Sequence, residues 1–313
     1  MSRKTIIGSF LLCVLVLLFV WTFGFWDFVD DEHARTVLFS IRLPRVLLAA
    51  LCGASLSAAG VISQGLFQNP LASPSVLGAS SGGVLGAILV YYFAKPWLHW
   101  FLLPSSAFLG TLLTLSFVLM MFKRGNGWDS AHLLICGFVI TTFLSAVSSM
   151  ILAILLPQFE KAASLMQWMM GGFSGRSWEH LAFALPGSVL GFLLSFSLAR
   201  KLDVLSLGDE MAGALNVQVR SLQRWSVIAI ALLVGSATSV AGALPFVGLI
   251  VPHISRGLVG SSHRVLLPFS ILNGMLLIVL ADFFAQRLLF PRELDLGSFT
   301  SLLGVGFFFW LFF

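Results

Sequence analysis

The sequence is short of charge. Only 10% of its 313 residues are Asp, Glu, Lys or Arg, against roughly 25% in a typical soluble domain, and 58% are hydrophobic. A water-soluble fold of this composition would lack the polar side chains needed to cover its surface. Contact with lipid removes that need, and the 30 Phe and nine Trp suit lipid-facing and interfacial positions. We therefore expect an all-α, polytopic membrane protein that lies in a lipid bilayer.

Motifs for self-contained catalysis are missing. The chain has no G-x-x-x-x-G-K-[ST] phosphate-binding loop, no H-E-x-x-H and no G-x-S-x-G. Its six histidines do not fall at ligand spacings, and Cys13, Cys52 and Cys136 lie in apolar runs without a C-x-x-C pair. We expect no catalytic residue, no metal, no bound cofactor and no disulfide. The net charge of +5 is scattered in ones and twos, which excludes a nucleic-acid partner and suits loops beside membrane spans.

Apolar runs long enough to cross a bilayer recur along the whole chain, since about 20 helical residues span the hydrocarbon core. The candidate spans are 5–26, 44–63, 77–94, 98–122, 132–156, 181–199, 224–243, 246–260, 266–290 and 297–313. No linker or repeat divides them, so we expect one membrane domain over 1–313. The first run is too long for a signal-peptide core and lacks a cleavage site. The distribution of Lys and Arg favours an internal amino terminus, and ten spans then place both termini inside.

Rows of small residues predict close helix packing. Gly78, Gly82 and Gly86 form G-x-x-x-G-x-x-x-G in the third predicted span, and Gly53 lies in a similar row in the second. Such rows let helix backbones approach each other in lipid. A purely structural role is at least as plausible as a role in a transport pathway. In either case the rows indicate a compact bundle.

Charged residues at the outer ends of two spans suggest two sites. Arg42 and Arg45 flank Pro44 at the start of the second span. They are either interfacial anchors or a docking point for acidic residues of an outside partner. Asp282 lies within an apolar span, where carboxylates are functional candidates, and Gln286 and Arg287 are possible partners for a structural pair.

Two uncharged polar segments interrupt the spans. Residues 64–75 form a simple inner loop or a turn that lines a pathway, because irregular backbone at membrane depth needs protein or a water cavity around it. Residues 242–256 carry prolines and glycines within an apolar run, as the discontinuous helices of transporters do. A lone histidine here is more often structural than a ligand. The candidate pathway or gate residues are Gln64, Gln68, Asn69, Pro70, Ser73, Pro245, Gly248, Pro252 and His253.

Residues 205–217 form a third polar interruption, on the inner side of the predicted topology. Asp209 and Glu210 fall in the first turn of a short predicted helix, where acids favour the positive end of the helix dipole. Gly213 and Ala214 leave a surface that another protein could approach. The alternative is a plain amphipathic surface helix.

Taken together, these segments resemble the FecCD family, the permease subunits of type II ATP-binding-cassette (ABC) importers for iron-siderophores, haem and cobalamin. The resemblance rests on RLPRVLLAALCGASLSAAGVISQGLFQNPLASPSVLGASSG (42–82), MQWMMGGFSG (166–175), LSLGDEMAGALNV (205–217), GALPFVGLIVPHISR (242–256), HRVLLP (263–268), LLIVLADFFAQ (276–286) and ELDLGSFTSLLG (293–304). Their order and spacing fit along nearly the whole chain. The tail departs from the family pattern by lacking two prolines.

The resemblance implies ten spans, a homodimer, two cytoplasmic ATPase subunits that hold ATP and Mg, and a substrate-binding protein outside the cytoplasmic membrane of a prokaryote. It implies that segment 205–217 couples to the ATPase. The residues implied for coupling are Leu207, Gly208, Asp209, Glu210, Ala212, Gly213 and Leu215. It implies binding-protein docking at Arg42 and Arg45, with Arg287 near the family's third arginine. We expect the cargo to be an iron chelate, with cobalamin, or an ion-coupled transporter that uses Asp282, as alternatives.

Overall fold

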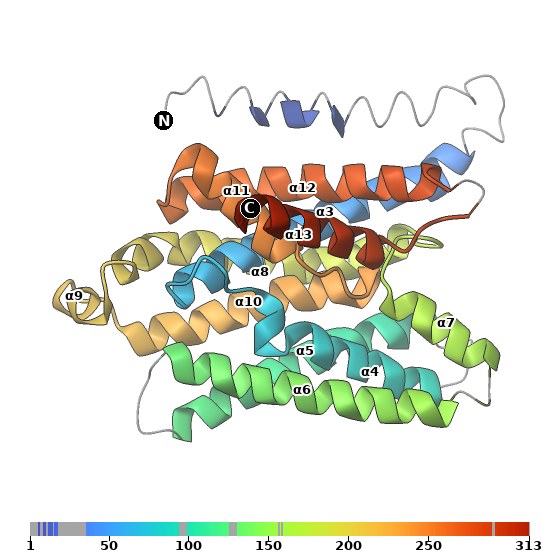
Figure 1. The fold of residues 1–313 in the computed structure, drawn as a ribbon, viewed down its shortest axis with the longest axis horizontal. Helices are drawn as coiled ribbons and strands as arrows, with labels where there is room; N and C mark the ends of the chain where they lie inside the picture. Colours follow the sequence, from blue (N-terminus) through green and yellow to red (C-terminus); the bar gives the residue numbers. More distant parts are fainter. Residues whose placement is uncertain are drawn as a thin grey trace.

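The computed structural model describes residues 36–93, 99–124, 130–155, 157, 159–289 and 292–312, and a few helical residues at 6, 9–10, 12–14 and 16–17. Regular structure in these residues is helical throughout (Figure 1). The long helices are α3 (Leu43–Leu66), α5 (His99–Arg124), α6 (Ser130–Leu155), α8 (Trp178–Leu205), α10 (Val219–Ala241) and α12 (His263–Arg287). The shorter elements are η2 (Leu38–Arg42), η3 (Pro74–Leu77), α4 (Ala79–Phe93), α7 (Phe159–Met169), α9 (Asp209–Ala214), α11 (Val247–Val259) and α13 (Leu296–Phe312).

The helices agree with the predicted membrane spans from the second to the tenth. The six long helices are apolar enough to cross a membrane, and α4, α11 and α13 are shorter apolar helices. Helix α7 was not among the predicted spans; it is only 11 residues long. The first predicted span, 5–26, lies largely outside the described residues.

The long helices run along a common direction, so the bundle has two ends (Figure 1). Helix α9 lies at one end, and α7 lies at the other. We call these the α9 end and the α7 end. Helix α3 starts at the α7 end and leads towards the α9 end (Figure 1). The two ends therefore carry different sets of the polar segments identified in the sequence.

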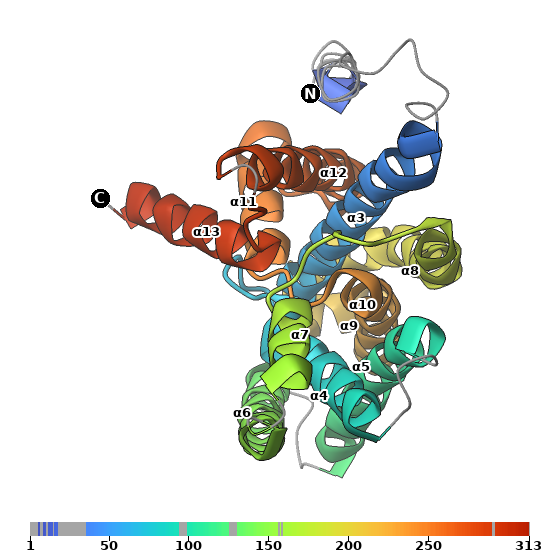
Figure 2. The same cartoon turned by 90° about the vertical axis from the view of Figure 1, so that its right-hand side faces the viewer.

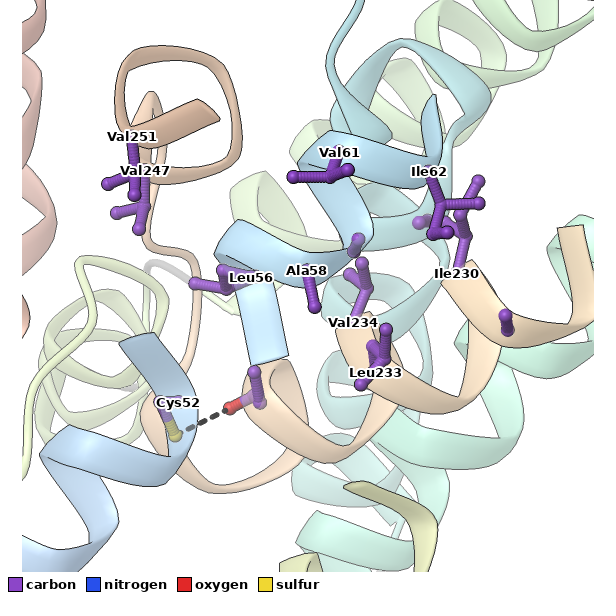
Figure 3. Packing of buried hydrophobic residues seen from close by; sticks show 14 of the residues in the cluster. Cys52, Leu56, Ala58, Val61, Ile62, Ile230, Leu233, Val234, Val247 and Val251 are labelled. Atoms are coloured by element: carbon purple, nitrogen blue, oxygen red, sulfur yellow. Dashed lines mark hydrogen bonds between the residues drawn. The ribbon is translucent and has the colours of Figure 1, made fainter. Parts of the chain in front are cut away.

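Helix α3 is the centre of the bundle. It packs against α8, α10, α11 and α12 (Figure 2), and from Leu48 to Leu66 every residue except Leu51 is buried. Ile62 lies near Ile230 of α10, and Leu56 points towards α11 (Figure 3). A helix surrounded on all sides needs small side chains wherever a neighbour crosses it, because interiors are close-packed.

Glycines set those crossings. A methyl group added at Gly53 would overlap the carbonyl oxygen of Gly274 in α12, and one at Gly60 would overlap that of Gly248 in α11. The backbones of α3 and its two neighbours are therefore in direct contact. Pro252 lies four residues after Gly248 and has no N–H, so it cannot donate to the Gly248 carbonyl that faces Gly60.

The glycine row in the third predicted span is confirmed in part. Gly82 and Gly86 face α5, where an added methyl group would overlap Thr114 and the Ser106 carbonyl respectively. The prediction that Gly78 shares this helical face with Gly82 and Gly86 is wrong. It precedes α4 and caps η3 with a left-handed φ of 80°, a conformation that glycine adopts without steric cost. Pro74 starts η3, which is a separate short turn before α4 begins.

Three connections meet at a second cluster of glycines, which we call the glycine joint: Gly171 after α7, Gly242 after α10 and Gly297 in the first turn of α13. The amide of Gly172 donates to Ala241 O at 2.8 Å, and that of Gly297 donates to Met170 O at 2.9 Å. Added methyl groups at Gly242 and Gly297 would overlap the carbonyls of Trp168 and Met170 respectively. At this joint, backbone groups that lie outside regular helices hydrogen-bond to other backbone groups and not to side chains. Buried backbone at membrane depth needs such partners.

Candidate functional site

The α9 end carries the predicted coupling segment, and a short helix forms there as expected. Gly208 precedes α9 with a φ of 102°, and Asp209 and Glu210 occupy its first turn. Ala212 is fully buried and anchors the helix to the bundle. Gly213 has open space where a side chain would stand.

Apolar side chains on this segment face outward. Leu207, Met211 and Leu215 are 64%, 51% and 55% exposed. Leu207 precedes α9, Met211 lies within it and Leu215 follows it, so exposed apolar side chains are present along the whole segment. Together with the two acids they form a small mixed surface at the α9 end, which we call the α9 surface.

The polar turn after α3 contacts α9 directly. Gln68 has a φ of 49°, which is uncommon for a residue other than glycine, and its side-chain amide donates to Asp209 Oδ1 at 3.2 Å. Asn69 Oδ1 accepts the amide of Leu71 at 2.9 Å and closes the turn. Asn69 and Pro70 are exposed, and Ser73 is half-buried and within 2.7 Å of Ser75 Oγ.

Gln64, one turn earlier, joins α3 to α11. Its Oε1 accepts Arg256 Nη2 at 2.8 Å, and its Nε2 donates to Leu249 O at 3.2 Å. Residues 242–256 are broken as predicted, because Phe246 at the start of α11 has a φ of 64°. The predicted pathway residues in this segment have separate places: Pro245 is half-buried before α11, Gly248 packs on α3, and Pro252 is buried within α11. The ring of His253 is 5.6 Å from that of Phe307 in α13.

Sequence reasoning missed Asp203 as a link at the α9 end. This residue in the last turn of α8 accepts the backbone N–H of His263 at 2.6 Å and its Nδ1 at 2.8 Å. Its other oxygen accepts Ser262 Oγ at 3.1 Å. The other side of the His263 ring lies against Gly65, where an added methyl group would overlap Nε2. Asp203 therefore ties α8, just before the coupling segment, to α12 and α3.

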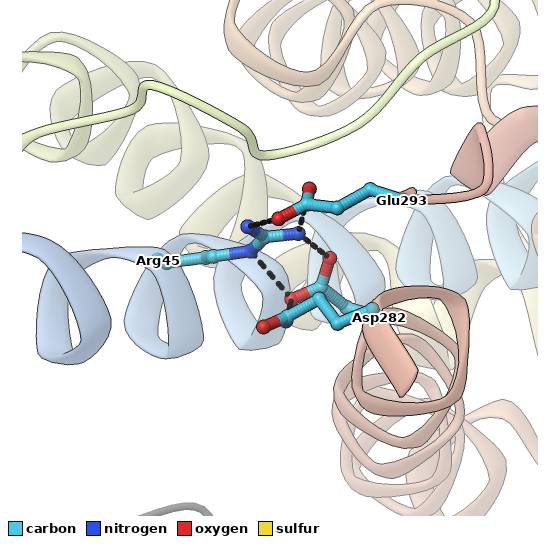
Figure 4. Close-up of polar contacts among 4 residues, drawn as sticks. Arg45, Asp282 and Glu293 are labelled. Atoms are coloured by element: carbon cyan, nitrogen blue, oxygen red, sulfur yellow. Dashed lines mark hydrogen bonds and ion pairs between the residues drawn. The ribbon is translucent and has the colours of Figure 1, made fainter. Parts of the chain in front are cut away.

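The α7 end carries a network of charges that we call the Arg45 network. Arg45 donates from Nε and Nη2 to the two oxygens of Asp282, both at 2.9 Å (Figure 4). Its Nη1 and Nη2 also donate to Glu293 at 3.2 and 3.1 Å. Gln286 Nε2 adds a bond to Asp282 Oδ2 at 2.8 Å. The network joins the start of α3, the end of α12 and the segment before α13.

Burial is uneven within this network. The Asp282 side chain is 5% exposed and that of Arg45 is 13% exposed, whereas that of Glu293 is 43% exposed. A cavity of about 740 Å³ opens beside all three groups and is also lined by Arg176 and Arg292. The α7 end is therefore hollowed and rich in charge.

The other two predicted docking arginines lie near the network. Arg42 is half-buried in η2, one turn before Arg45. Arg287 is exposed, and its guanidinium lies over the ring of Phe283 at 4.9 Å. Arg287 was expected as a possible partner of Asp282, but Gln286 and Arg45 hold those positions.

Comparison with known proteins identifies the family. A sequence profile described as the FecCD transport family matches residues 5–313. The chain belongs to the FecCD transport family. It is 38% identical to the hemin transport system permease protein HmuU of Yersinia pestis, over 91% of this chain and 86% of that protein. It is 37% identical to the cobalamin import system permease protein BtuC of Halobacterium salinarum, over 91% and 75% respectively.

A solved structure gives the same result for the fold. It is described as an inward-facing, metal-chelate type ABC transporter, and it matches with a TM-score of 0.90, 31% identity and 99% coverage of both chains. This FecCD chain is thus an ABC importer permease, a multi-pass helical membrane protein and not itself an ATPase. A permease of this kind works with an ATPase and a binding protein. Both oxygens of Asp282 accept hydrogen bonds from protein groups, which suits a structural pair.

Proposed function

We propose that this FecCD permease forms a homodimer that imports an iron chelate, siderophore-bound iron or haem, across the cytoplasmic membrane. Two ATPase subunits on the inner side would hold ATP and Mg and supply the energy. A substrate-binding protein would deliver the chelate from outside. The α9 surface is the observation that carries this proposal, because a permease without a phosphate-binding loop needs a docking helix for its motor.

The α9 surface fits such a partner. Its three exposed leucine and methionine side chains, Leu207, Met211 and Leu215, offer apolar contact, and Asp209 and Glu210 offer charge. The contact between Gln68 and Asp209 carries a displacement of α9 to the uncharged turn after α3. That turn would then act as the inner gate of the pathway. A weakly polar gate suits a bulky chelate, because a strong binding site would retain it.

Helix α13 supports the homodimer. It projects away from the bundle (Figure 2), and Leu302, Val305 and Phe309 are 72%, 47% and 62% exposed. A second copy of the chain would cover part of this apolar surface and enclose the pathway between the two copies. Both termini would lie inside, on the same side as α9.

Reconstitution tests the proposal. The permease is placed in proteoliposomes with and without its ATPase, and uptake of ferric hydroxamate, hemin and cobalamin is measured separately with the binding protein and ATP. We expect uptake of an iron chelate that requires both ATP and the ATPase. Uptake that persists without the ATPase would overturn the proposal in favour of an ion-coupled transporter. Uptake of cobalamin alone would support the second candidate, a cobalamin importer, because the chain is also 37% identical to a cobalamin permease.

A further inference from the structure

The Arg45 network contains one carboxylate more than its arginine needs. Asp282 alone binds the Nε–Nη2 edge of the guanidinium through two bonds of 2.9 Å. Glu293 covers the remaining edge, through Nη1 and Nη2, at 3.2 and 3.1 Å. Glu293 occupies this edge, so a further carboxylate can bind Arg45 there only after Glu293 leaves.

The two carboxylates differ in how firmly they are held. Asp282 is buried in α12 and fixed by a second donor, Gln286. Glu293 is 43% exposed and lies in the segment between α12 and α13, so water already reaches its carboxylate. Its departure would uncover the Nη1–Nη2 edge of Arg45 beside the 740 Å³ cavity, which has room for a side chain from another protein.

We propose that Glu293 occupies, in the free permease, the site on Arg45 that a carboxylate of the binding protein takes on docking. In the free permease Glu293 holds the outer edge of Arg45. On docking, an acidic side chain of the partner takes that edge and Glu293 swings out. Asp282 keeps the guanidinium oriented throughout. This exchange rests on the proposed function, because it requires a binding protein at the α7 end.

The exchange would also reach the start of α13. Glu293 is three residues before Leu296, whose amide donates to Gly171 O at 3.1 Å in the glycine joint. The amide of Leu294, next to Glu293, donates to Ala285 O at 3.0 Å. Release of the Glu293 side chain therefore removes a bond that holds this segment to Arg45 of α3, while the backbone bonds to α12 and to the glycine joint remain.

The test measures the affinity of the binding protein encoded with this permease for the intact permease–ATPase complex in nanodiscs. Glu293→Gln keeps the shape and removes the competing charge, so affinity should rise about three- to fivefold, the range expected for a partly exposed ion pair. Asp295→Asn is the matched control, because Asp295 lines the same cavity in the same segment but is not one of the two carboxylates that bind Arg45. It should change affinity by less than about 1.5-fold, because a nearby charge that does not occupy the Arg45 edge acts only through screened repulsion.

A double-mutant cycle separates exchange from general charge effects. In an Arg45→Gln background, Glu293→Gln should no longer raise affinity, because there is no guanidinium edge to release. Equal affinity for the parent and Glu293→Gln would overturn the exchange, as would an equal gain from Asp295→Asn or a gain that persists without Arg45. Failure of every variant and of the parent to bind the partner would overturn the proposed partner itself, and the exchange with it.

Discussion

Replacing Gly53 with alanine should weaken the contact between α3 and α12 at the centre of the bundle. The added Cβ would lie 2.7 Å from the carbonyl carbon of Gly274 and 3.0 Å from Ile278 Cβ. Carbon atoms pack at about 3.5–4.0 Å, so the two helices must separate by roughly 1 Å. Overpacking of this kind costs about 1–3 kcal/mol. At about 2–4 °C per kcal/mol, the value for domains of about 150–250 residues, the apparent Tm should fall by about 2–12 °C.

A thiol-reactive fluorescent dye in detergent measures this change, because Cys52 is 1% exposed and becomes reactive on unfolding. Gly257→Ala in α11 is the control, since an added methyl group there meets nothing within 4 Å. It should leave the apparent Tm unchanged or raise it slightly, as helix propensity predicts. Adding Gly274→Ala to Gly53→Ala should cost less than the sum of the two, because both methyl groups enter one contact. Equal melting of Gly53→Ala and Gly257→Ala would refute the backbone contact.

Three further changes test the two ends of the bundle. Asp282→Asn breaks a buried ion pair and should cost about 3 kcal/mol, seen as a lower apparent Tm; an unchanged Tm would contradict the Arg45 network. Asp203→Ala should cost about 0.5–2 kcal/mol through the lost cap of α12, and Asp203→Asn, which keeps an acceptor for the His263 amide, should cost less; equal losses would contradict the capping role. Asp209→Lys with Glu210→Lys should reduce co-purification of the ATPase, and unchanged recovery would contradict coupling through α9.

The positions of the helices could be predicted from the sequence because they depend on local properties. Apolar length predicts the spans, and the acids at Asp209 and Glu210 predict the start of α9. Gly78 was misplaced because the G-x-x-x-G pattern continues past the true start of α4. Proline at the start of η3 makes a short turn, and Gly78 is then needed for its left-handed φ rather than for helix packing.

The polar network was harder to predict because its partners are far apart in the chain. Arg45 is 237 residues from Asp282 and 248 from Glu293, and Asp203 is 60 residues from His263. Residue spacing on one helix reveals only partners such as Gln286, four positions from Asp282. Arg287 has the charge expected of a partner, but its position on the helix places it over Phe283. Docking by Arg42, Arg45 and Arg287 stays a prediction.

The glycine joint has a mechanical consequence for α10. This helix begins at Val219, just after the coupling segment, and ends at the joint. Its 23 residues make a rod about 34 Å long. If an ATPase docks at the α9 surface as proposed, α10 would act as a lever with its pivot at the joint, and a tilt of about 5° would move its α9 end by about 3 Å, as follows from that length. A push at α9 would then rotate a buried helix while the α7 end stays still.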